Sequence, residues 1–168
     1  MIFWDIFINS MTTNQSDYEK VRDFTLQAGQ MCASEPTPMT RYEVVFLLRM
    51  CLSELQELAL TVTDSVDESV QLLYDSLKTI DKSQHVKLDN PDELIAAQAD
   101  SIVDLWYYGL NAFSKKSVDL SAIFNVVHES NMDKRDLVTK KFMKREDGKI
   151  LKREGWMPPD IGAVVSDL

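Results

Sequence analysis

Two long stretches with few polar positions dominate the hydrophobic pattern of the chain. Residues 41–61 read RYEVVFLLRMCLSELQELALT, and residues 94–113 read LIAAQADSIVDLWYYGLNAF. Both patterns predict helices that are apolar on most of their surface and therefore buried. Two acids interrupt each run; they are Glu54 and Glu57 in the first stretch, and Asp100 and Asp104 in the second. Spacings of three and four residues separate side chains by about 60° and about 40°, so each pair shares one helix face.

The two acid pairs allow two interpretations. All four side chains can point to solvent, as surface acids commonly do. Alternatively, the pairs are buried, and a divalent cation compensates like charges whose burial would otherwise be costly. We favour the metal site, because two apolar helices that each carry an acid pair are typical of carboxylate metal sites in helix bundles. Glu54 or Glu57 would also orient or deprotonate a water molecule. Asn111 lies two turns beyond Asp104 on the same face.

Helix-capping signals divide the rest of the chain into further helices. Ser16 to Glu19 and Thr40 to Glu43 are capping boxes, Asn90-Pro91 starts the second apolar helix, and Asp119 caps another. Helices are also predicted over residues 67–80 and 120–128. Asp147-Gly148 predicts a hairpin turn, and residues 155–161 predict an extended tail. The fold class is therefore all-α: a bundle of about four to five helices with a short C-terminal hairpin or extended tail.

Length and composition narrow the class of protein. The 168 residues predict a single domain over 1–168, with an N-terminal segment at 1–15 and a basic extension at 132–168. A net charge of −9 argues against a nucleic-acid polymer as partner. Cys32 and Cys51 have no metal or disulfide spacing, which fits a reducing cytoplasm. No apolar run reaches the roughly 18 residues that span a membrane. The opening MIFWDIFI lacks a basic start and is a poor signal peptide, so we expect it to pack on the body or on a partner chain.

The basic extension offers a second candidate for chemistry. It holds nine of the 18 basic residues: Lys134, Arg135, Lys140, Lys141, Lys144, Arg145, Lys149, Lys152 and Arg153. It is either a solvated tail that balances an acidic body or a site where lysines reach phosphate oxygens. Trp156 or Phe24 would then stack on a base. His85 and His128 are isolated, so soft-metal chemistry is not expected, and the chain lacks a glycine-rich phosphate loop and a Ser or Cys nucleophile arrangement.

These motifs resemble the all-α nucleoside triphosphate pyrophosphohydrolases, the MazG-like superfamily that includes phosphoribosyl-ATP pyrophosphohydrolase and dimeric dUTPases. Glu54 and Glu57 meet its E-x-x-E motif, and Asp100 and Asp104 resemble its second acid motif. Where the family often has a further Glu, this chain has Ser53. The C-terminal signature is similar as well, with S-N-M-x-K at 130–134, D-G-K at 147–149 and W-x-P-P-D at 156–160. Residues 24–29 resemble the substrate-side first helix, with Thr25 where His is usual.

The resemblance implies a metal-dependent enzyme that cleaves a (d)NTP, with dGTP or dUTP as candidate substrates, between the α- and β-phosphates to give monophosphate and pyrophosphate. Roughly two or three Mg²⁺ or Mn²⁺ ions would be held by Glu54, Glu57, Asp100 and Asp104. Asn131 and Lys134 would contact the nucleotide, with Lys149 or Lys152 assisting. It also implies a homodimer or dimer of dimers with sites near the subunit interface. Two alternatives stay open: a non-enzymatic helical interaction module, and a phosphoribosyl-ATP pyrophosphohydrolase.

Overall fold

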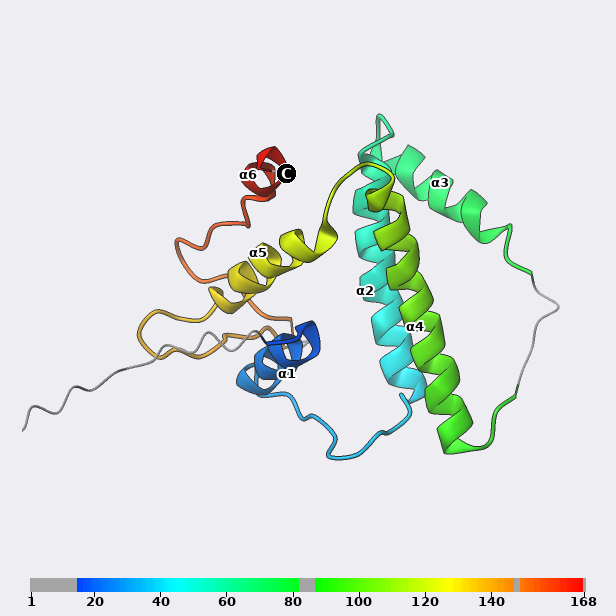
Figure 1. The fold of residues 1–168 in the computed structure, drawn as a ribbon, viewed down its shortest axis with the longest axis horizontal. Coiled ribbons are helices and arrows are strands. Elements are labelled where there is room, and N and C mark those ends of the chain that lie inside the picture. Colours follow the sequence, from blue (N-terminus) through cyan, green and yellow to red (C-terminus); the bar gives the residue numbers. More distant parts are fainter. Residues whose placement is uncertain (1–14, 82–86, 147–148, 168) are drawn as a thin grey trace, which may run out of the picture. The chain divides into compact units, whose positions relative to one another are not determined.

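The structure, a computed structural model, describes residues 15–81, 87–146 and 149–167, and these residues form six helices and no strand (Figure 1). The helices are α1 (Asp17–Gln27), α2 (Arg41–Leu60), α3 (Val66–Leu77), α4 (Pro91–Ser114), α5 (Leu120–Met132) and α6 (Ile161–Ser166). The predicted all-α class is confirmed, with the short α6 added. The segment MIFWDIFI, His85 and the turn Asp147-Gly148 lie outside the described residues.

The chain divides into two compact units. One unit is Glu35–Tyr107, and the other combines Met1–Ser34 with Tyr108–Leu168. The boundary falls inside α4, so this helix belongs to both units. The first unit contains α2, α3 and most of α4, whereas α1, α5 and α6 belong to the second.

Helices α1 and α2 begin at the two predicted capping boxes. The Ser16 backbone N–H donates to the Glu19 carboxylate at 2.8 Å, and the Thr40 backbone N–H donates to the Glu43 carboxylate at 2.7 Å. The cap hydroxyls in turn accept from the backbone N–H groups of the two glutamates. These backbone hydrogen bonds hold the pKa of both carboxyls below the usual value. Local sequence alone therefore sets where both helices start.

Small side chains allow α3 to pack closely against the end of α2. Ser69 is fully buried, and Ala59 is the buried residue of α2. The Ser69 hydroxyl donates to the Val66 carbonyl at 2.7 Å and accepts from the Gln56 amide at 3.3 Å. Helix α3 ends at Leu77, three residues before the predicted end, because it closes in a turn in which the Thr79 hydroxyl donates to the Ser76 carbonyl.

The prediction that α2 and α4 are buried helices is wrong for the single chain. Among the described residues only Ala28, Ala59 and Ser69 are buried. Phe46 and Leu58 on α2 are 51% and 57% exposed, and Trp106 on α4 is 57% exposed. The apolar faces exceed what the neighbouring helices of one chain can cover. None of the helices in the described ranges is long and apolar enough to cross a membrane.

The C-terminal part folds back along its own chain. Helix α5 continues to Met132, four residues past its predicted end at His128. Lys144 and Ile150 form an antiparallel bridge, and the Leu151 N–H donates to the Met143 carbonyl at 2.8 Å, so the flanks of the predicted hairpin are paired. Asp160 caps α6 by accepting from the Ala163 N–H at 2.9 Å.

The cap of α2 can be tested with one substitution. Thr40→Ala removes the hydroxyl that accepts from the Glu43 N–H, and the loss of such a cap costs about 1 kcal/mol of unfolding free energy. Thr37→Ala is the matched control, because the Thr37 hydroxyl binds only the Glu35 carbonyl in the preceding linker; it should change stability by less than about 0.5 kcal/mol. Urea denaturation followed by circular dichroism measures both. Equal stability of the two variants would contradict the capping role.

Candidate active site

Three lysines predicted to bind phosphate gather beyond the end of α5, and we call Lys134, Lys149 and Lys152 the lysine cluster. The Lys134 ammonium donates to the Asn131 side-chain oxygen at 2.6 Å. The charges of Lys149 and Lys152 act on Lys134, although both lie at least 15 residues further along the chain. The structure thus brings together Asn131 and the three lysines that the sequence analysis named.

The indole of Trp156 lies within the same group. The Lys152 ammonium is 4.3 Å from the ring centroid and the Lys134 ammonium is 5.3 Å from it. The indole N–H donates to the Ser130 carbonyl at 2.9 Å. Gly155 precedes it with φ 69°, a left-handed conformation that favours glycine. The turn at Gly155 therefore brings the indole back against α5.

The electrostatics of the cluster favour an anion. Partial burial lowers the pKa of the Lys134 ammonium below its usual value, and the charges of Lys152 and Lys149 lower it further. Each effect penalises the positive charge when no counter-ion is present. A phosphate bound here would relieve both effects, because it supplies the opposite charge and accepts hydrogen bonds.

An arginine fastens the C-terminal segment to α5. The Arg153 guanidinium forms an ion pair with Asp133 at 2.6 Å, and its Nε donates to the Asp133 carbonyl at 2.8 Å. Its third contact is the Glu154 carbonyl at 2.9 Å. In the sequence, Arg153 stands out only as one member of the basic C-terminal run. Gly155, two residues further on, is the sequence feature that could have indicated that the segment turns back toward α5.

Phe24 packs in an apolar contact elsewhere in the same unit. Its ring meets Phe142 edge to face, with centroids 5.0 Å apart. Helix α1 is also tied to α5 by the Lys20 ammonium, which donates to Asn125 at 2.6 Å. Phe24 is half-buried in this contact, so its predicted stacking on a base stays a prediction.

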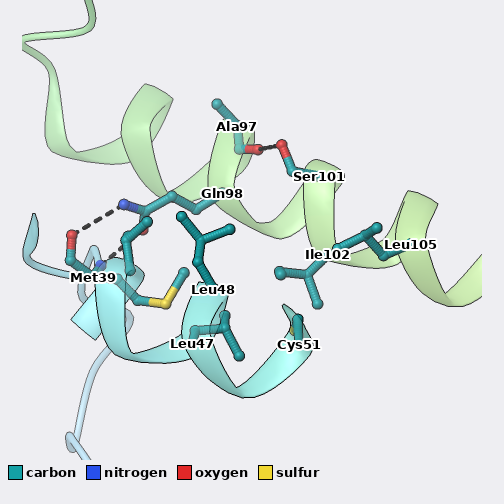
Figure 2. Close-up of a pocket in the computed structure, with 10 residues that line it drawn as sticks. Met39, Leu47, Leu48, Cys51, Ala97, Gln98, Ser101, Ile102 and Leu105 are labelled. Atoms are coloured by element: carbon teal, nitrogen blue, oxygen red, sulfur yellow. Dashed lines mark hydrogen bonds between the residues drawn. The ribbon is translucent and has the colours of Figure 1, made fainter. Parts of the chain in front are cut away.

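Helices α2 and α4 lie side by side and run in the same direction (Figures 1 and 2). Their acid pairs, Glu54 with Glu57 and Asp100 with Asp104, are all exposed. The cost of burying like charges therefore does not require a cation within one chain, contrary to the sequence argument. Among the described residues, no three His, Cys, Asp or Glu side chains are grouped so that they could hold a metal ion.

The parallel direction explains why the pairs stay apart. Measured around α2 from the centre of its α4-facing stripe, Glu54 and Glu57 lie at roughly 70° and 130°. Around α4, Asp104 and Asp100 lie at roughly 90° and 130° in the same rotational sense. Equal rotations on two parallel helices lead to opposite flanks of the pair. Asn111, near the end of α4, is also exposed.

An open apolar pocket of about 330 Å³, which the sequence did not predict, lies between α2 and α4 (Figure 2). Leu47, Leu48, Ile102 and Leu105 are among its lining residues. At one end the Gln98 amide makes two hydrogen bonds with the backbone of Met39, at 2.7 and 3.0 Å. In the sequence, the only sign of this contact is Gln98, a single glutamine within the apolar residues 94–113.

Comparison with known proteins agrees with the motifs and the fold. Residues 21–131 match the phosphoribosyl-ATP pyrophosphohydrolase family. A crystal structure from Exiguobacterium sp. 255-15, described as a "putative NTP pyrophosphohydrolase", superposes with a TM-score of 0.77 at 20% identity, covering 91% of this chain and 96% of that one. At that identity the likeness shows the fold alone. No curated protein matches. The family match extends over more than half of the chain, so this protein belongs to the phosphoribosyl-ATP pyrophosphohydrolase family and is a nucleotide pyrophosphohydrolase.

Proposed function

We propose that the protein hydrolyses a nucleoside triphosphate between the α- and β-phosphates, releasing a monophosphate and pyrophosphate. The observation that carries the proposal is the lysine cluster with Asn131, because three ammonium groups and an amide in one place suit an oligophosphate. Family membership supplies the reaction class. Together they favour an enzyme over the alternative of a non-enzymatic interaction module.

The lysine cluster has two roles in this reaction. Its positive charges bind the triphosphate, and they also stabilise the negative charge that builds on the leaving pyrophosphate. Asn131 holds the Lys134 ammonium through its side-chain oxygen, so the lysine is fixed before substrate arrives. A fixed cation loses little freedom on binding, which favours affinity.

We propose two candidate classes of substrate. The resemblance of the C-terminal signature favours a deoxynucleoside triphosphate, with dGTP or dUTP as candidates. The family match favours phosphoribosyl-ATP as the second candidate. Both carry the phosphate chain that the lysine cluster would bind, so the base and the sugar must be identified by assay.

The acid pairs are our candidates for holding Mg²⁺ or Mn²⁺. Carboxylate oxygens are the ligands that these hard cations prefer. The ions would supply an activated water and neutralise phosphate charge. Within the described residues of one chain, no three of these acids are grouped. Metal binding by Glu54, Glu57, Asp100 and Asp104 would therefore require α2 and α4 each to pack against another helix that brings further acids close.

A panel of nucleotides tests the reaction. Purified protein with Mg²⁺ is offered each common dNTP and NTP, dUTP and phosphoribosyl-ATP, and pyrophosphate and orthophosphate are measured separately. We expect pyrophosphate from one or two substrates and loss of the activity in EDTA, because divalent ions are proposed to take part. Repetition with Mn²⁺ is the control for metal identity. Orthophosphate as the sole product would contradict the proposed bond, and no turnover of any substrate would contradict the proposed reaction.

We also propose that a second copy of the chain covers α2 and α4. Many of their large apolar side chains are about half exposed, and extensive exposed apolar surface marks an association surface. If α4 of a second copy packed antiparallel to α2 of the first, the acid pairs would lie differently from those of the parallel α2 and α4 within one chain. Equal rotations on antiparallel helices lead to the same flank, so the Glu pair of one copy and the Asp pair of the other would meet.

Mixed oligomers test this arrangement. Glu57→Gln and Asp104→Asn should each reduce turnover by about 100-fold or more as pure proteins. A heterodimer of the two, co-expressed with different tags, keeps one site with both native acids if each site uses two copies, so it should regain activity. Glu93→Gln, an exposed acid at the start of α4, is the matched control and should stay active. A monomer in light scattering, or an inactive heterodimer, would contradict the proposal.

The pH dependence of binding tests Lys134. Its pKa is lowered, so with rising pH it loses its charge earlier than an ordinary lysine. The Michaelis constant of the wild type should therefore rise over the alkaline range below the usual lysine pKa. Arginine stays charged there, so Lys134→Arg should show a flatter profile. Lys115→Arg, outside the cluster, should follow the wild type. Parallel profiles for the wild type and Lys134→Arg would show that another group controls binding.

A further inference from the structure

We propose that Trp156 is a positioning residue that holds the ammonium groups of Lys134 and Lys152 where they bind the phosphate chain, and that it does not stack on the base. This role rests on the proposed function of the lysine cluster. It differs from the stacking that the sequence predicts for Trp156, and it assigns the aromatic ring to the cations of the site.

The first support is the position of the two ammonium groups. They lie 4.3 Å and 5.3 Å from the centroid of the Trp156 ring. Both distances are within the range in which the ring attracts a cation, and tryptophan is the side chain that does so best. The ring thus binds two of the three positive charges of the cluster.

The second support is the fixed position of the indole itself. Its N–H donates to the Ser130 carbonyl in α5 at 2.9 Å, and the Ser130 hydroxyl donates to the Met157 carbonyl at 3.3 Å. The Gly155 turn and the Arg153–Asp133 ion pair fasten the chain immediately before it. A ring held at its edge and by its backbone can serve as a rigid support for flexible lysine chains.

The third support is that the ring can offset the repulsion between the positive charges of the lysine cluster. The charges of Lys149 and Lys152 act on the like charge of Lys134, so holding the three lysines together has an electrostatic cost. The electron-rich ring face offsets part of this repulsion. The lysines are then already in place when the substrate arrives, and less freedom is lost on binding. The same contacts leave less of the ring free for a nucleobase.

A ligand without a base separates positioning from stacking. Binding of inorganic tripolyphosphate and of dGTP is measured by calorimetry in EDTA, so that no hydrolysis occurs. If Trp156 positions the lysines, Trp156→Leu weakens both ligands by the same factor, about tenfold for two lost cation–π contacts. Trp156→Phe keeps an aromatic face and should stay within about threefold of the wild type. Loss of dGTP affinity alone would show that the ring stacks on the base and would overturn the proposal.

Two controls protect this test. Tyr74→Leu removes a comparable contact with Lys78 on α3, at 4.6 Å, and should leave both affinities unchanged. Fluorinated tryptophan withdraws electron density from the ring while keeping its shape, so it serves if Trp156→Leu does not fold. Fluorination should weaken tripolyphosphate binding in the wild-type sequence but not in Trp156→Phe. Equal effects in both sequences would overturn the proposal.

The outcome is independent of turnover. A wild-type protein that hydrolyses no nucleotide, but binds tripolyphosphate and loses that binding in Trp156→Leu, would contradict the proposed function and still support the positioning role. A wild-type protein that hydrolyses nucleotides but does not bind tripolyphosphate would overturn the positioning role alone.

Discussion

The limited burial of apolar surface within one chain is the constraint from which the other features of this structure follow. Removal of apolar area from water is the main driving force of folding, and here the described helices leave large side chains about half exposed. What holds each unit together is consequently specific: small residues at the α2–α3 contact, hydrogen bonds such as Gln98 to Met39, and an ion pair between Arg153 and Asp133. Polar contacts of this kind fix geometry more than they supply free energy.

The sequence predicted the features that depend on neighbouring residues. Both capping boxes and the starts of α4 and α5 are confirmed, because a cap uses side chains only a few positions away. The hydrophobic pattern alone did not predict the exposure of α2 and α4, since an apolar pattern says that a surface will be covered but not by which chain. The parallel direction of these helices was equally out of reach, and it decides on which flank each acid pair lies.

The structure groups the predicted nucleotide-binding residues but not the predicted metal-binding acids. The residues proposed to bind the nucleotide came largely from a sequence signature, and the structure brings Asn131 together with the lysine cluster. The contact of two ammonium groups with Trp156 could not be derived from spacing, because the three residues meet only after the chain turns at Gly155. The acid pairs match their motif in sequence, but their grouping depends on partners that spacing does not specify.

Helix α4 carries several of the residues discussed above at fixed positions along a single helix. Gln98 fastens it to Met39, Asp100 and Asp104 follow, and Asn111 lies near its end. Loss of one residue between Gln98 and Asp104 would turn everything beyond it by about 100° and shift it by about 1.5 Å. Substitutions along this stretch change one side chain, whereas insertions and deletions would move every later feature to another face. The number of residues in α4 is therefore under a stricter constraint than most of their identities.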